Sequence, residues 1–89
     1  MRIKKDYELE SRSGQYVIVY KGKPTGAALN SIVLADTAVF LWNLLKEKDV
    51  TKTEMLEAVI SNFDISTVLA LGNIDVFVRI MKENEIIEE

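Results

Sequence analysis

The spacing of apolar residues changes once along this chain, and the change separates a strand-forming part from a helix-forming part. Up to about Leu34 the pattern is typical of strands: residues 7–11 alternate apolar with polar, and residues 15–20 are mostly β-branched or aromatic. From Asp36 onward, apolar residues recur every three or four positions, as on one face of an α-helix. The order predicts an α+β chain in which strands precede helices.

Three strands are expected in the first part. The turn-forming residues 11–14 lie between the first two runs and predict a β-hairpin. Residues 21–26 contain the only proline and form the clearest loop, and residues 31–34 follow as a short third strand. Both faces of the 15–20 strand are partly apolar. We expect one face to cover the core, and other residues can pack against the second face. We expect a three-stranded antiparallel sheet.

The first helix should begin after Asp36, a good N-cap candidate, and run to Glu47. Its apolar residues at i, i+3, i+4 and i+7 are Ala38, Leu41, Trp42 and Leu45. Because Trp42 belongs to this face, we interpret the only tryptophan as core rather than as part of a site.

Two further helices have clear start signals. Thr51 and Glu54 have the spacing of a capping box, and Ser66 can cap the third helix. The third helix is expected to end at Asn84 in a left-handed conformation. Residues 85–87 then close the fold as an extended tail.

Length and composition indicate one domain over residues 1–89, with a hydrophobic fraction of 48% that is typical of a folded chain. The N-terminal stretch lacks the apolar core of a signal peptide, and no apolar run approaches the roughly 18 residues of a spanning helix. Without cysteine there is no disulfide to indicate secretion. We expect a soluble cytoplasmic protein that does not enter a membrane.

Catalysis is not expected, because the chain contains neither histidine nor cysteine and its carboxylates are scattered over expected solvent faces. No phosphate-binding glycine motif is present, so we predict no catalytic residue, metal or cofactor. The net charge of −3 disfavours nucleic-acid binding, and the third helix carries only Arg79 and Lys82 as cations behind an apolar start. We therefore expect a binding role.

The third helix has more apolar surface than one core face needs. One face gathers Ala70, Ile74, Phe77, Val78 and Met81, which we assign to the core. A second stripe of Leu69, Val76 and Ile80 lies about 120° away. Either strands or the C-terminal tail cover this stripe, or it borders an exposed groove for a partner. Gly72 fits both alternatives, because it permits close approach of another backbone.

The order of these elements resembles the protein D family of pyrroloquinoline-quinone biosynthesis, the PqqD-like peptide-recognition domains. The resemblance covers nearly the whole chain and rests on IKKDYELES, LADTAVFLWNLL and the pattern of FDIS followed by NIDVFVRIMKENEII. Three positions depart from the family pattern: Ala35 replaces the usual Asn, Ala38 the usual Gly, and Glu85 the glycine that commonly ends the last helix.

The resemblance implies a winged-helix-like fold and a non-catalytic role. Such domains bind the leader segment of a ribosomally made precursor peptide and present it to a modifying enzyme, often of the radical S-adenosylmethionine class. The leader adds as a strand to the sheet edge and packs into a groove beside the third helix, a known mode of peptide recognition. The expected peptide-binding residues are Ser31, Ile32, Val33, Leu34, Leu69, Gly72, Asn73, Val76 and Ile80.

Two alternatives stay open. An apolar stripe and an open strand edge also suit a self-associating structural protein, which would form a weak homodimer through the same surface. A quinone-binding carrier is suggested by the family's name alone, and no residue of this sequence marks a quinone site.

Overall fold

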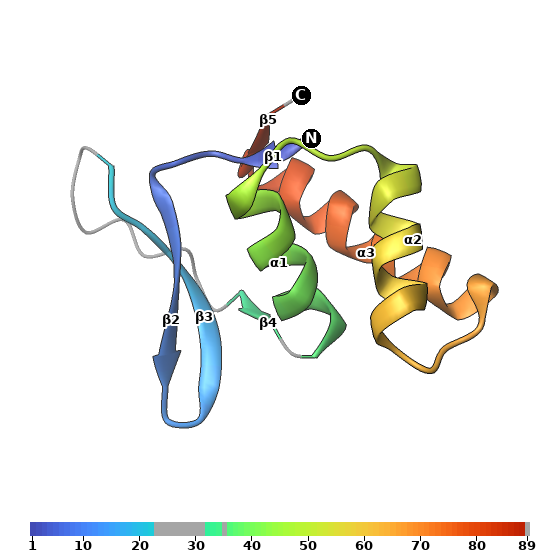
Figure 1. Cartoon of the computed structure of the whole chain (residues 1–89). Coiled ribbons are helices and arrows are strands. Elements are labelled where there is room, and N and C mark those ends of the chain that lie inside the picture. The colour runs from blue at the N-terminus through green and yellow to red at the C-terminus, as the bar shows by residue number, and fades with distance from the viewer. Residues whose placement is uncertain (23–31, 35, 89) are drawn as a thin grey trace.

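The computed structural model describes residues 1–22, 32–34 and 36–88 (Figure 1). The strands are β1 (Arg2–Ile3), β2 (Tyr7–Arg12), β3 (Gln15–Tyr20), β4 (Val33–Leu34) and β5 (Ile87–Glu88). The helices are α1 (Thr37–Glu47), α2 (Lys52–Asn62) and α3 (Thr67–Glu83). Strands β2, β3 and β4 form a three-stranded antiparallel sheet that precedes the helices, which confirms the expected α+β class.

The β2–β3 hairpin stands to one side of the helices, with β4 between β3 and the start of α1 (Figure 1). Arg12 pairs with Gln15, so the turn is formed by Ser13 and Gly14 alone, at φ angles of 51° and 79°. Two-residue hairpin loops favour positive φ because it matches the strand twist. The turn is thus shorter than residues 11–14, since Ser11 and Arg12 both belong to β2.

The expected third strand is shorter than predicted. Only Val33 and Leu34 form β4, while Ile32 accepts a backbone hydrogen bond from Ile18 just before it. Ser31, Ala35 and residues 23–26 of the expected loop lie outside the described residues.

The core lies where the three helices meet one face of the sheet. The largest fully buried side chains are Trp42, Ile18, Leu41, Leu45, Met55, Ile74, Met81, Ile86, Val50 and Val59. Trp42 is 1% exposed, which confirms its assignment to the core. Val19, on the opposite face of β3, is also buried, so this strand is partly covered on both faces.

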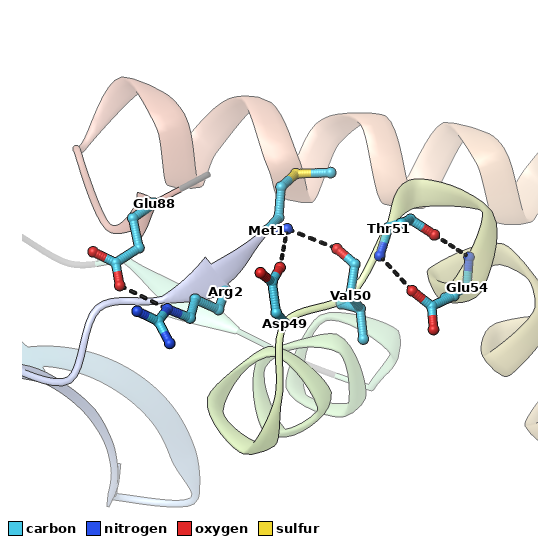
Figure 2. A network of polar contacts seen from close by, with 7 residues as sticks. All are labelled: Met1, Arg2, Asp49, Val50, Thr51, Glu54 and Glu88. Atoms are coloured by element: carbon cyan, nitrogen blue, oxygen red, sulfur yellow. Dashed lines mark hydrogen bonds and ion pairs between the residues drawn. The ribbon is translucent and has the colours of Figure 1, made fainter.

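The capping box at the start of α2 is confirmed. The Glu54 amide donates to the Thr51 hydroxyl at 3.1 Å, and the Thr51 amide donates to the Glu54 carboxylate at 2.9 Å (Figure 2). Ser66 likewise caps α3, because its hydroxyl accepts from the Leu69 amide at 3.2 Å. Both pairs satisfy amides that a helix start leaves without a partner.

Two other helix ends differ from expectation. Asp36 occupies the N-cap position of α1, but its φ of 45° and ψ of −111° leave its side chain without a capping hydrogen bond. At the end of α3, Asn84 has a φ of −99°, and Glu85 is the residue at positive φ, 57°. The Ile86 amide donates to the Met81 carbonyl at 2.9 Å. The left-handed residue that ends the helix is therefore one position later than predicted.

A two-stranded sheet of β1 and β5 was not predicted. Ile3 pairs with Ile87, and the Arg2 guanidinium contacts the Glu88 carboxylate at 2.7 Å (Figure 2). The Met1 ammonium group donates to Asp49 at 2.6 Å and ties the same end of the chain to the α1–α2 connection. The expected extended tail of residues 85–87 is confirmed only in part: Ile87 belongs to β5, whereas Glu85 lies in the turn after α3, and both Ile86 and Ile87 are buried.

Across the described part of the chain, none of the helices combines the length and the apolar character that crossing a membrane requires.

Candidate functional site

A hollow of about 430 Å³ lies between β4, the start of α1 and the second half of α3, and we refer to it as the β4 hollow. Its described lining residues are Val33, Leu34, Asp36, Thr37, Ala38, Asn73, Val76, Phe77, Ile80 and Met81. Valine, leucine, isoleucine, phenylalanine and methionine side chains make up most of this lining. The hollow is thus an apolar depression with a few polar groups, which is the usual character of a binding site.

The apolar lining has a buried floor and an exposed rim. Leu34, Phe77 and Met81 belong to the core and form the floor. Val33 and Val76 form the rim and are 44% and 47% exposed. A ligand that covers the rim would remove apolar surface from water without disturbing the core.

The edge of β4 beside the hollow has backbone groups that β3 does not bind. The Ile18 amide donates to the Ile32 carbonyl at 3.1 Å, which makes these residues a hydrogen-bonded pair of the antiparallel ladder. Since such pairs alternate with non-hydrogen-bonded ones, the next pair, Val17 and Val33, does not exchange hydrogen bonds. The N–H and C=O groups of Val33 therefore point away from β3, and no described strand pairs with that edge of β4.

Asp36 is the only charged residue in the described lining of the β4 hollow. It also lines a smaller hollow of about 230 Å³ that extends toward the hairpin turn and shares Val33 and Leu34 with the first. Its positive φ is uncommon for a residue other than glycine, and such conformations concentrate at functional sites. Its carboxylate is exposed and is not used to cap α1.

The structure brings together five of the nine residues expected to bind a peptide. These are Val33, Leu34, Asn73, Val76 and Ile80, which line the β4 hollow.

Of the remaining four, three lie outside the described lining of the hollow. Ile32 is half-buried and packs against the core, while Leu69 and Gly72 are exposed on α3 outside the lining of the hollow. Ser31 is outside the described residues.

The second stripe of α3 is divided between the two alternatives. Leu69 and Val76 are exposed, at 62% and 47%, whereas Ile80 is half-buried and packs against the core. The stripe is thus open over most of its length and covered only at its C-terminal end.

Sequence reasoning missed the wall that α1 contributes. Asp36, Thr37 and Ala38 line the hollow because the chain enters α1 directly after β4. The signal in the sequence was their position: residues that connect an edge strand to the next helix lie at the end of that strand.

A second hollow, of about 490 Å³, lies between β1 and the end of α1. Five cations and four carboxylates line it, and several are already paired, among them Arg2 with Glu88 and Lys46 with Glu8 at 3.5 Å. The mixture gives no preference for either sign of ligand charge. Within residues 1–22, 32–34 and 36–88 there is also no group of three or more acidic side chains placed to hold a metal ion.

Comparison of the chain with models of known families, with curated proteins and with solved structures gives no match. The function is therefore inferred from the geometry of the site.

Proposed function

We propose that this chain is a non-catalytic peptide-binding module that takes up an extended segment at the free edge of β4. The observation that carries the proposal is the coincidence of the outward-facing backbone groups of Val33 with the apolar rim formed by Val33 and Val76. Strand addition needs both features, because main-chain hydrogen bonds supply affinity and side-chain contacts supply selectivity.

The resemblance to PqqD-like domains gives the proposal its biological form. We infer that the bound segment is the leader of a ribosomally made precursor peptide, and that the module presents it to a modifying enzyme, of the radical S-adenosylmethionine class by that resemblance. Such a module would act in the cytoplasm, where precursor peptides are synthesised. It would carry no catalytic group, metal or cofactor of its own.

Selection from a display library of random peptides tests this function and does not require that the precursor be identified first. Bound peptides are then compared on the wild type, on Val76→Asp and on Val68→Asp. Val68 is a matched control, since it lies on the same helix and is 79% exposed but does not line the β4 hollow. We expect selected peptides that bind the wild type and Val68→Asp but lose affinity for Val76→Asp. Absence of enrichment, or binding indifferent to Val76→Asp, would contradict the proposal.

Self-association is a second candidate, favoured by the adjacent exposed residues Val68 and Leu69 at the start of α3. We expect a monomer at low micromolar concentration and weak dimers in the absence of peptide, because a dimer through the open stripe competes with a peptide. Sedimentation measurements distinguish the cases. A dimer that persists at saturating peptide would show that the dimer and the peptide use different surfaces.

A further inference from the structure

We propose that the segment bound at β4 runs antiparallel to it and carries two apolar residues at alternate positions, with a basic residue on their N-terminal side. This inference rests on the proposed peptide-binding function and specifies the sequence class of the ligand. It follows from the register of β4, the apolar floor of the β4 hollow and the position of Asp36.

The register fixes which ligand side chains enter the hollow. Only Val33 of β4 directs both backbone groups outward, so one peptide residue exchanges both hydrogen bonds with it in an antiparallel pair. The side chain of that peptide residue lies on the same face as Val33, which is the exposed face of β4.

The two neighbours of that peptide residue point the opposite way, to the face of Leu34. That face meets the floor of the β4 hollow, where Phe77 and Met81 lie beside Leu34. Apolar side chains are therefore expected on both sides of the residue that faces Val33, separated from each other by that one residue.

The charge preference comes from Asp36. In an antiparallel peptide, a residue N-terminal to the partner of Val33 lies toward Leu34 and the start of α1, on the side of the β4 hollow that Asp36 lines. A Lys or Arg there can reach the carboxylate, which is the sole charge in the described lining and has no capping role. A carboxylate at the same ligand position would be repelled by Asp36.

Antiparallel addition is favoured over parallel addition for two reasons. Every described pairing of β3 is antiparallel, and antiparallel pairs are slightly more stable per residue than parallel ones. In addition, one peptide residue then satisfies both outward groups of Val33, whereas a parallel strand would use two residues.

The test uses short synthetic peptides with blocked ends, built from a Ser/Thr host with Ile and Leu at the two apolar positions. Lys, Gln or Glu occupies the second position before the first apolar residue, and a fourth peptide has the Lys sequence reversed. Binding is measured by calorimetry on the wild type, on Asp36→Asn and on Asp64→Asn. Asp64 is a matched control, an exposed carboxylate between α2 and α3 outside the lining of the hollow.

For the wild type and Asp64→Asn we expect affinity to fall from Lys to Gln to Glu, with about threefold to tenfold between the extremes. For Asp36→Asn the three forward peptides should bind equally, since the charge is gone while the size of the side chain is kept. The reversed peptide should bind the wild type more weakly than the forward one.

Two outcomes overturn the inference in different ways. If the forward peptides bind the wild type with equal affinity, or if Asp36→Asn keeps their ranking, the proposed charge preference is wrong while peptide binding stands. If none of these peptides binds although the display selection yields peptides that do, the inferred sequence class is wrong and the proposed function stands; if the selection also yields none, both fail. The wild-type ranking needs no variant, so it decides the matter even if Asp36→Asn were poorly folded.

Discussion

Val33 lies opposite Val17 in the ladder between β3 and β4, at a position where the two residues do not hydrogen-bond each other. This relationship turns the backbone of Val33 toward the open edge, next to the rim residue Val76 on α3. An edge strand with free backbone groups is a template for another strand, and proteins usually protect such edges. Here the described edge is short and adjoins an apolar hollow, and the proposed function assigns it to one specific ligand.

Replacing Val76 by Asp should weaken binding of a selected peptide about tenfold, because the ligand must then bury a carboxylate against the apolar rim. The fold should persist, since Val76 is already 47% exposed. Titration calorimetry with circular dichroism of each variant measures both effects. Val68→Asp should leave the affinity unchanged, so equal losses in the two variants would indicate a general effect on α3.

Replacing Gly72 by Ala should raise the free energy of unfolding by about 0.5–1 kcal/mol, because glycine within a helix is less favourable than alanine. A Cβ at this position would meet nothing within 4 Å, so no packing penalty opposes the gain. Urea unfolding measures the change. Peptide affinity should stay the same, because Gly72 does not line the β4 hollow. A loss of affinity would restore Gly72 as a close-approach site for the ligand.

Trp42 should contribute strongly to the stability of the fold. Trp42→Ala should lower the free energy of unfolding by about 3–5 kcal/mol, because it leaves a cavity where the largest core side chain lies. For a small domain this is a large part of the total stability. Thermal unfolding monitored by circular dichroism tests it, and Asn43→Ala on the exposed side of α1 serves as the control. A stable Trp42→Ala variant would contradict the core assignment.

Stability should fall in acid partly through Glu54. The Thr51 amide, and then the Thr51 hydroxyl, hold the pKa of Glu54 below its ordinary value of 4.5. A carboxylate whose pKa is lower in the folded state stabilises the fold above its unfolded pKa, and this contribution is lost as the pH falls through the folded pKa. Glu54→Gln keeps a capping-box partner without the charge.

The variant should therefore show a shallower loss of stability below about pH 4.5 than the wild type, measured by urea midpoints across the acid range. Some loss remains, because Lys21 and Arg12 also lower the pKa of Glu10 in both proteins. Parallel acid profiles of variant and wild type would show that the Glu54 charge has no part in acid unfolding.

The helices were predictable because their start signals are local. Thr51 with Glu54, and Ser66, act through hydrogen bonds within three residues, so sequence spacing is enough to identify them. The end of α3 was misplaced by one residue, because Asn is the better left-handed residue by propensity, yet Glu85 takes the positive φ.

The β1–β5 sheet and the α1 wall of the site depend on long-range contacts. Ile3 meets Ile87 only after the whole chain has folded, and a two-residue strand has no period of its own. Likewise Asp36 has the sequence of a helix cap, and only its backbone conformation shows that its carboxylate is not used as one. The apolar residues that α3 contributes to the site could be predicted from their spacing, but the position of Asp36, the one charge in the described lining, could not.

The most direct test of the central claim is the amide of Val33 in the ¹⁵N-labelled protein, observed by NMR with and without a peptide from the display selection. If the peptide adds as a strand, the Val33 N–H becomes hydrogen-bonded: its exchange with solvent should slow, and it should show a nuclear Overhauser contact to the peptide backbone. If Val33 exchange stays unchanged at saturating peptide while other residues respond, such as those of the charged hollow near β1, then the β4 edge is not the binding site.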